Sequence, residues 1–260
     1  MFLAVDIGNT HTVLGVIGKK KIIRNWRIHT GRHATADELA ALLNQLAAMA
    51  EINLADMQDV IIACVVPPLL HAWEEYSVKY LKKAAIILKG DMPLGMPIIY
   101  KRPHEIGADR IVNAIGAYAR YRQALIVIDY GTAITFDCVS SGGEYLGGSI
   151  APGIMLAAEA LFHGTSRLPR IEISAEPKCA IGQDTNSAIR SGIIYGFAGL
   201  TEGIIKRLSK EFPEMPKVIA TGGLASLIAP YCPAIEEVLP DLTLDGLAVI
   251  YKRLKTLSSD

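Results

Sequence analysis

The sequence predicts an α/β fold made of two related halves, each a mixed β-sheet covered by helices. Three observations predict it. A hairpin with an Asp-x-Gly turn near the N-terminus recurs in mid-chain, strands come first in hairpins and then alternate with helices, and 260 residues suffice for two domains with cores. We expect three-layer domains over residues 1–118 and 119–260, with a cleft between them.

The first hairpin is expected over residues 3–16, LAVDIGNTHTVLGV, where an apolar run enters a short polar turn and an alternating run leaves it. Asp6 ends the apolar run, where a carboxylate is costly unless a cation or hydrogen bonds satisfy it. Gly8 permits close approach of a ligand, and Asn9 and Thr10 supply short donors that suit phosphate oxygens. The pattern favours a phosphate and magnesium site, although an ordinary tight turn uses the same Gly-Asn chemistry.

The second hairpin is expected over residues 125–137, LIVIDYGTAITFD. Aligning the two stretches pairs Asp6 with Asp129, Gly8 with Gly131 and Thr12 with Thr135. Two such hairpins resemble the superfamily that includes acetate and sugar kinases, heat-shock ATPases and actin. This resemblance implies two duplicated, ribonuclease H-like (actin-like ATPase) domains with a nucleotide site between them.

The rest of the first half alternates between strands and helices. Strands are expected over residues 22–28, 60–66 and 84–88, and a helix follows Pro67-Pro68. Thr35 and Glu38 have the spacing of a capping box that opens another helix. Apolar residues at helical spacing predict its core face: Leu39, Leu42, Leu43, Leu46 and Met49.

Residues 103–110, PHEIGADR, are expected to open a helix that runs through Tyr118. Gly107, Ala108, Asp109 and Arg110 then lie near its N-terminus, where the dipole and unpaired N–H groups favour anions. Asp109 beside Arg110 is a candidate functional carboxylate. An acid paired with the helix dipole, next to a surface arginine, would explain the pattern equally well.

The second half is rich in glycine. Residues 145–153, YLGGSIAPG, predict a glycine-rich turn into a helix whose residues Leu156, Ala160 and Leu161 pack inward. An irregular segment over 163–183 precedes a long helix from Thr185, and a strand over 218–223 and a helix over 242–254 complete the chain. The long helix carries one stripe of Gly192, Gly196, Gly199 and Gly203. Interior helical glycines are costly, so the stripe indicates close packing by another backbone, in a second copy or in the same chain.

Composition narrows the function. Lys plus Arg equals Asp plus Glu, at 26 each, which argues against nucleic acid because phosphate-backbone binding needs a basic face. Four widely spaced cysteines and the lack of a secretory signal suit the cytoplasm. The apolar runs are too short for a membrane helix. The sequence also lacks the G-x-x-x-x-G-K-[ST] loop of P-loop kinases and the G-x-G-x-x-G of Rossmann cofactor sites.

Four motifs in order carry a closer resemblance: DIGNT at 6–10, GADR at 107–110, DYGTA at 129–133 and GGSIAPG at 147–153. Together they resemble the type III pantothenate kinases, as do Thr165 with Leu168-Pro169, Gly182 with Thr185, and ATGG at 220–223. The resemblance covers nearly the whole chain. One departure is Arg102, where family members commonly carry Asn before the proline.

The resemblance implies an ATP-dependent kinase that phosphorylates the primary hydroxyl of pantothenate, giving 4'-phosphopantothenate in the first step of coenzyme A biosynthesis. It assigns Asp109 as general base, Asp129 as ligand of a monovalent cation (K⁺ or NH₄⁺) and Asp6 as a ligand of the Mg²⁺ that accompanies ATP. The implied ATP contacts are Asp6, Ile7, Gly8, Asn9, Thr10, His11, Thr12, Val13 and Thr132. The implied pantothenate contacts are Tyr100, Gly107, Ala108, Asp109, Arg110 and Thr185. Family members are homodimers whose substrate pocket is closed at the dimer interface.

The chemistry of phosphoryl transfer agrees with these residue types. It needs positioning and charge neutralisation more than covalent chemistry, one carboxylate to take the hydroxyl proton, and a guanidinium for the acceptor's carboxylate. The repeat also permits a symmetric arrangement in which Asp6 and Asp129 both serve Mg²⁺. Two other functions compete with the pantothenate kinase: a non-catalytic regulatory relative, which replacement of Asp6, Asp109 or Asp129 would favour, and a small-sugar kinase, which should lack the GADR block.

Overall fold

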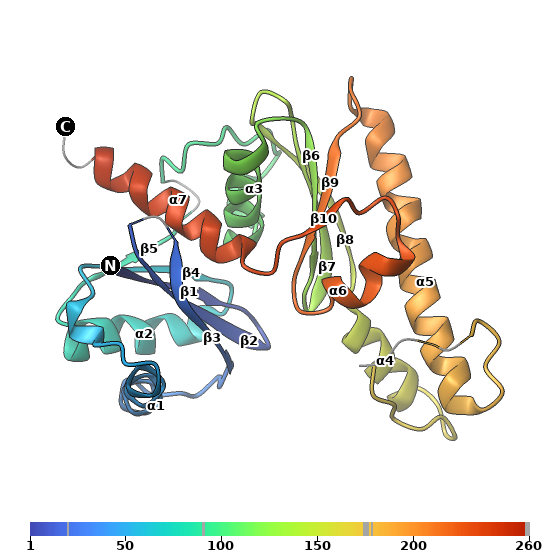
Figure 1. The fold of residues 1–260 in the computed structure, drawn as a ribbon, viewed down its shortest axis with the longest axis horizontal. Helices are drawn as coiled ribbons and strands as arrows, with labels where there is room; N and C mark the ends of the chain where they lie inside the picture. Colours follow the sequence, from blue (N-terminus) through green and yellow to red (C-terminus); the bar gives the residue numbers. More distant parts are fainter. Residues whose placement is uncertain (20, 90–91, 174–176, 178, 258–260) are drawn as a thin grey trace. The chain divides into compact units, whose positions relative to one another are not determined.

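The computed structural model describes residues 1–19, 21–89, 92–173, 177 and 179–257 (Figure 1). They divide into two compact units. Unit 1 comprises Met1–Met96, Lys101–Ala119 and Leu242–Asp260, and unit 2 comprises Pro97–Tyr100 and Arg120–Asp241. Each unit contains a five-stranded mixed sheet, so the predicted α/β fold with two mixed sheets is confirmed.

The two sheets have the same topology. Unit 1 contains β1 (Phe2–Ile7), β2 (His11–Ile17), β3 (Ile22–His29), β4 (Val60–Cys64) and β5 (Ala85–Ile87), in the order β3-β2-β1-β4-β5. Unit 2 contains β6 (Leu125–Tyr130), β7 (Ala133–Val139), β8 (Tyr145–Pro152), β9 (Lys217–Thr221) and β10 (Glu237–Val238), in the order β8-β7-β6-β9-β10. In both, the first three strands pair antiparallel and the last two are added in parallel. This shared order confirms the duplication.

The two hairpins differ by one residue in the turn. Asp6 pairs with Val13, whereas Asp129 pairs with Thr135. The first turn therefore has three residues between its strands and the second has two. The pairing of Thr12 with Thr135 in the sequence alignment is wrong, because the extra residue shifts every later position of the first hairpin by one.

Helices cover both faces of the unit 1 sheet (Figure 1). One face carries α1 (Ala36–Met49) and α2 (Pro67–Tyr80), which pack on each other and enclose the first apolar core. The other carries α7 (Leu242–Leu257), which packs on β1, β2 and β4. Helix α3 (Ala108–Tyr121) crosses α7 closely, since a Cβ at Gly246 would lie 2.1 Å from the Val112 carbonyl oxygen. The expected halves differ from the units chiefly in α7, which completes the first unit.

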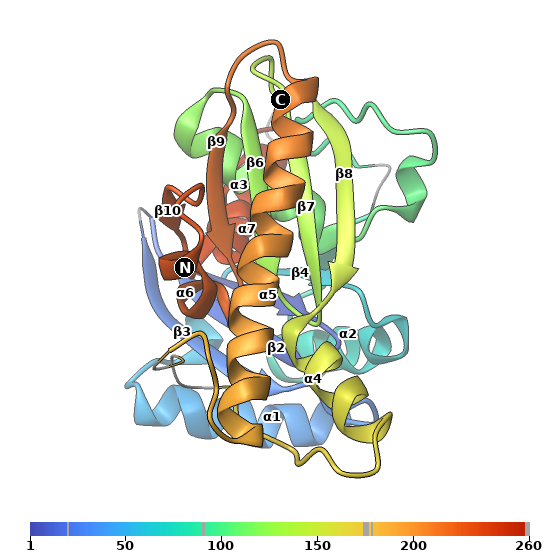
Figure 2. The same cartoon turned by 90° about the vertical axis from the view of Figure 1, so that its right-hand side faces the viewer.

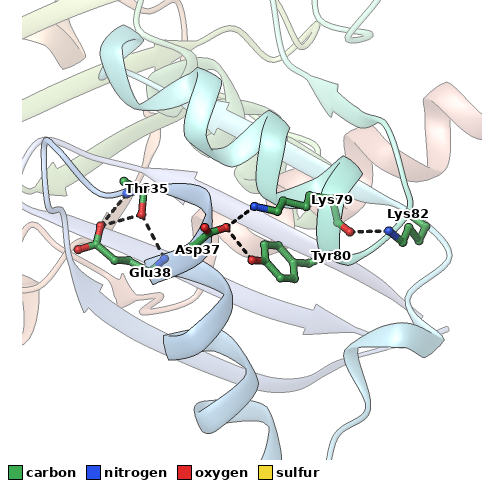
Figure 3. Close-up of polar contacts among 6 residues, drawn as sticks. All are labelled: Thr35, Asp37, Glu38, Lys79, Tyr80 and Lys82. Atoms are coloured by element: carbon green, nitrogen blue, oxygen red, sulfur yellow. Dashed lines mark hydrogen bonds and ion pairs between the residues drawn. The ribbon is translucent and has the colours of Figure 1, made fainter.

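Figure 3 shows how α1 begins and how it is tied to α2. Thr35 Oγ1 accepts the Glu38 N–H at 3.3 Å and Glu38 accepts the Thr35 N–H at 2.8 Å, which confirms the predicted capping box. Asp37 accepts hydrogen bonds from Lys79 and Tyr80 of α2, at 2.6 Å each. On the predicted core face of α1, Leu39 and Leu43 are buried. The prediction is wrong for Leu42 and Met49, which lie at the edge of the apolar stripe and are exposed.

In unit 2, α5 (Thr185–Leu208) runs along one face of the sheet (Figure 2). Its residues Ile194, Phe197 and Ile205 enter the second core together with α6 (Ala225–Ile228). Helix α4 (Ile154–His163) follows β8. Four short 3₁₀ helices complete the described elements: Leu54–Asp56, Pro103–Glu105, Ser209–Glu211 and Ala229–Tyr231.

Two expectations for the second half are wrong. The glycine-rich stretch 145–153 is mainly the edge strand β8 rather than a turn, because Gly147 and Gly148 pair with Cys138 and Asp137. On α4, Leu156, Ala160 and Leu161 are exposed, since only Ile154 of that helix is buried. No helix in the described part of the chain is long and apolar enough to cross a membrane.

Candidate active site

The first turn, Gly8–Thr10, joins β1 to β2. The Gly8 N–H donates to the His11 carbonyl at 3.1 Å, and a Cβ at Gly8 would lie 2.9 Å from that oxygen, so the turn has no room for a side chain there. Asn9 and Thr10 are exposed at its tip. Partial burial, followed by the charges of Arg27 and His29, lowers the pKa of His11, which is therefore mainly neutral at pH 7. The turn thus offers dipoles rather than positive charge.

The eight residues assigned to ATP at this turn are not equivalent. Ile7 is fully buried in the core between the sheet and α1 and α2, and Thr12 is 2% exposed. Their side chains face away from solvent, so only their backbone groups are available to a nucleotide. Val13 and Asp6 are half-buried. Strand alternation points Asp6 to the sheet face opposite Ile7.

Cys64, at the end of β4, lies close to Asp6. Burial, and to a lesser extent the negative charge of Asp6, raises the pKa of the Cys64 thiol. The thiol therefore stays protonated at neutral pH and adds no second anion beside Asp6. An aspartate beside a turn rich in donors fits Mg²⁺, which in kinases is held by one or two carboxylates and by substrate phosphates.

Asp109 lies in the first turn of α3. Its Oδ1 accepts the Arg110 N–H at 2.8 Å. Burial is the largest influence on this carboxyl and raises its pKa, against the opposing effects of the Arg110 N–H and the Arg110 charge. A raised pKa brings a carboxylate closer to the range in which it accepts and releases a proton readily at neutral pH. The neighbouring Arg110 is 8% exposed.

Gly107 makes room for this carboxylate. A Cβ at Gly107 would lie 2.5 Å from Asp109 Oδ1 and 3.7 Å from Val65 Cγ1. Val65 follows β4, and its N–H donates to the Ile7 carbonyl at 3.0 Å. The start of α3 therefore lies near the C-terminal ends of strands β1 and β4. Unit 1 thus brings residues 107–110, the GADR block, to the same end of the sheet as the first turn, which follows β1.

Unit 2 builds the second turn around Asp129 and Thr132. Asp129 is half-buried at the end of β6, and Thr132 is exposed. A Cβ at Gly222 would lie 2.4 Å from Asp129 Oδ1, and one at Gly153 would lie 2.0 Å from the Thr132 carbonyl oxygen. The backbone of Gly222, at φ +92°, therefore packs closely on the Asp129 carboxylate. The backbone of Gly153 packs closely on the second turn.

Two residues assigned to pantothenate lie far apart in unit 2. Tyr100 packs edge-on against Tyr145 at 6.3 Å, where β8 begins. Thr185 opens α5 and lines a pocket of about 580 Å³ together with Leu161 of α4, beyond the other end of β8 (Figure 2). Strand β8 has eight residues and spans about 23 Å. One copy of unit 2 therefore does not bring Tyr100 and Thr185 together.

The sequence pattern did not reveal every residue of the site. Thr30, which bonds to the first turn, has no sequence signal beyond its position after a strand. Gly222 belongs to a Gly pair that was expected after β9, but its contact with Asp129 depends on the parallel pairing of β6 and β9. Among the described residues, no group of three or more His, Cys, Asp or Glu side chains could hold a metal ion.

Comparison with known proteins identifies the family. The sequence model of the type III pantothenate kinases matches residues 2–207. A type III pantothenate kinase of Desulfatibacillum aliphaticivorans is 50% identical over 98% of this chain and 99% of its own. One of Syntrophobacter fumaroxidans is 49% identical over 98% and 99%.

Solved structures agree on the fold. A conserved putative Baf family transcriptional activator from Campylobacter jejuni has a TM-score of 0.61 at 21% identity and covers 98% of this chain and 100% of its own. A ROK hexokinase from Thermus thermophilus has a TM-score of 0.56 at 13% identity, covering 97% and 99%. At such identities these two show only the shared fold. The matches of family model and relatives over most of the chain show that it belongs to the type III pantothenate kinase family.

Proposed function

We propose that this protein transfers the γ-phosphoryl group of ATP to the primary hydroxyl of pantothenate, the first step of coenzyme A biosynthesis. The observation that carries the proposal is the position of the Asp109 carboxylate. It lies at the start of α3, at the same end of the unit 1 sheet as the first turn. It occurs in a chain about half identical to pantothenate kinases over nearly its whole length. A kinase also agrees with the fold of the hexokinase neighbour.

In this mechanism Asp109 is the general base. The hydroxyl oxygen of pantothenate attacks the γ-phosphorus while the bond to the β,γ-bridging oxygen breaks. ADP leaves, and the hydroxyl proton passes to an Asp109 carboxylate oxygen. The backbone N–H of Arg110 donates to that carboxylate at 2.8 Å and holds it in one orientation. The raised pKa of Asp109 makes it a better proton acceptor than an ordinary exposed aspartate.

The phosphates are assigned to the two turns. The backbone N–H groups of the first turn and the Thr132 side chain would hold phosphate oxygens, and Asp6 would face the Mg²⁺ that accompanies ATP. Bound Mg²⁺ supplies neutralisation of the charge on the phosphates. No cage of protein ligands is required, because Mg²⁺ keeps several of its waters.

Asp129 is assigned to a monovalent cation, K⁺ or NH₄⁺. Its carboxylate lies against the backbone of Gly222 and near Gly131, so little side-chain bulk surrounds it and a large cation has room to approach. The symmetric alternative places Mg²⁺ at both Asp6 and Asp129. Separate titrations of KCl and MgCl₂ distinguish the two.

Arg110 is assigned to the carboxylate of pantothenate, and the family resemblance assigns Tyr100, Gly107 and Ala108 as further contacts of this substrate. A guanidinium presents a planar pair of donors that matches a carboxylate. Its burial, with 8% of its surface exposed, makes such an ion pair stronger than one at the surface. Small sugars have no carboxylate, so this residue also favours pantothenate over the sugar-kinase alternative.

The assembly is proposed to be a homodimer formed through α4 and α5. A Cβ at Gly192, Gly196 or Gly199 would meet no described atom within 4 Å beyond the helix backbone and chain neighbours. These three glycines therefore make no close contact with the rest of their own described chain, whereas a Cβ at Gly203 would lie 3.3 Å from the Arg207 guanidinium. Leu156, Ile181 and Tyr195 are exposed apolar residues on or near these helices. A symmetric partner would cover them and bring its Thr185 to the pocket of the first copy.

Subunit complementation tests this arrangement. Asp109→Asn removes the base, and Thr185→Asp repels the pantothenate carboxylate while remaining compatible with the start of a helix. If Thr185 acts in the partner's pocket, a mixed dimer has one intact site, and co-expression restores about a quarter of wild-type turnover. Turnover no higher than that of the two single variants would contradict the shared pocket.

The overall assignment has a direct test. Purified protein is given ATP and Mg²⁺ with pantothenate or with a panel of small sugars, each with and without KCl. Pantothenate-dependent ADP formation that rises with KCl is expected. Equal turnover with a sugar would support the sugar-kinase alternative, and no turnover with any acceptor would support a regulatory relative.

A cytoplasmic location is proposed because none of the four cysteines, all within the described residues, is disulfide-bonded.

A further inference from the structure

Thr30 lies directly after β3 and bonds to the first turn through both its side chain and its backbone. Its Oγ1 donates to the Gly8 carbonyl at 2.8 Å, and its N–H donates to the Thr10 carbonyl at 2.9 Å. Thr30 is 4% exposed, so it makes both hydrogen bonds from a buried position. Two carbonyls of the three-residue turn are therefore held by one residue outside the hairpin.

Thr12 extends this contact. Its Oγ1 lies 3.0 Å from Thr30 Oγ1. A hydroxyl has one hydrogen to donate. Because Thr30 donates its hydrogen to Gly8, Thr12 is the donor of the second bond. The hydrogen-bond chain thus runs from the Thr12 hydroxyl to the Thr30 hydroxyl and on to the Gly8 carbonyl. Both hydroxyls belong to buried residues.

The planarity of the peptide bond gives this chain a consequence for the ligand side. The Gly8 carbonyl and the Asn9 N–H belong to one peptide group, and in a trans peptide they point in opposite directions. No cis peptide occurs among the described residues. When Thr30 holds the Gly8 carbonyl toward the core, the Asn9 N–H is directed away from it. An N–H in this orientation can donate to an anion beyond the turn.

The second hairpin shows that this support is particular to the first. His11 pairs with His29 and Ala133 pairs with Pro152, each at the first residue after its turn. The counterpart of Thr30 is therefore Gly153, which has no hydroxyl. There the backbone itself approaches the turn, with the Cβ position of Gly153 only 2.0 Å from the Thr132 carbonyl oxygen. The longer first turn uses a side chain where the shorter second turn uses direct backbone packing.

We propose that Thr30, supported by Thr12, is a positioning residue for ATP, which orients the Asn9 N–H toward a phosphate oxygen. Thr30 does not itself touch the nucleotide, because it lies buried on the other side of the turn. The inference rests on the proposed function only in taking the first turn as a phosphate site.

The test replaces Thr30 with Val, which keeps the shape and the backbone N–H but leaves the Gly8 carbonyl without its hydroxyl donor. Affinity for Mg²⁺-ATP, measured by calorimetry without pantothenate, should fall about tenfold, the equivalent of one hydrogen bond to an anion. KM for ATP should rise similarly, while KM for pantothenate stays within about twofold. Thr30→Ser retains the hydroxyl and should restore most of the affinity.

Thr35→Val is the matched control. It removes a threonine hydroxyl that caps α1 (Figure 3) and should lower the melting temperature by about 2–4 °C without touching the turn. Its ATP affinity should equal that of the wild type. If Thr30→Val lowers the melting temperature like Thr35→Val but leaves ATP affinity unchanged, Thr30 is merely structural and the proposal is overturned.

The two proposals can fail separately. Normal phosphorylation of pantothenate by the wild type, with unchanged ATP affinity in Thr30→Val, overturns the role of Thr30 and leaves the kinase intact. Weakened ATP binding in Thr30→Val, in a protein that phosphorylates no pantothenate, supports the role of Thr30 and refutes the acceptor.

Discussion

Replacing Gly107 with Ala should misplace the proposed catalytic base without removing it. The new Cβ would lie 2.5 Å from Asp109 Oδ1, so the carboxylate has to retreat by about 0.9 Å to reach an ordinary contact of 3.4 Å. A misplacement of about 1 Å near the reacting atoms costs on the order of 100-fold in rate. We therefore expect kcat to fall between about 10-fold and 100-fold, while KM for ATP is unchanged.

The assay is steady-state ADP release at saturating and limiting concentrations of each substrate. Gly142→Ala is the matched control, because a Cβ there would meet its nearest neighbours at 3.6 and 3.8 Å. In an Asp109→Asn background, where there is no base to misplace, Gly107→Ala should have little further effect. Full activity of Gly107→Ala, or an equal further loss in the Asp109→Asn background, would refute the link between Gly107 and the base.

Four further predictions concern the charged groups. Asp109→Asn should lower kcat by about 10²–10⁴-fold with ATP binding retained; calorimetry that shows lost ATP binding would contradict its role as base. Burial raises the pKa of Asp109 above its ordinary value of 3.8, so its contribution to stability is full below that pH and is lost as the pH rises through the folded-state pKa. The melting temperature of Asp109→Asn relative to wild type should therefore increase from pH 3.5 to pH 7, and a constant difference would contradict the raised pKa. Asp129→Asn should weaken activation by KCl and, through it, ATP binding, whereas a KCl response identical to wild type would leave the symmetric magnesium arrangement standing. Arg110→Lys keeps the charge but loses the planar pair of donors, so kcat/KM for pantothenate should fall more than that for ATP.

Periodicity and turn chemistry in the sequence were enough to predict most of the elements. Both hairpins, the capping box at Thr35 and the strand that ends before Pro67 form as predicted, because each depends on neighbours in the chain. The glycines of residues 145–153 wrongly predict a turn, because pairing with β7 makes most of this stretch a strand. The apolar residues of α4 were misassigned because spacing alone does not say whether a helix is covered by its own chain.

The sequence by itself determined the family resemblance and the identity of the candidate residues, since the four motifs are continuous stretches of chain. Only the tertiary structure decided how those residues can act. In the structure the side chains of Ile7 and Thr12 are buried, and the Asp109 carboxylate lies against the Cα of Gly107. Thr185 and Tyr100 lie in different parts of unit 2. The tertiary structure also brought Thr30 to the Gly8 carbonyl from 22 positions away. Strand register and helix packing set such distances, and both arise from contacts between residues remote in sequence, on which local pattern carries no information.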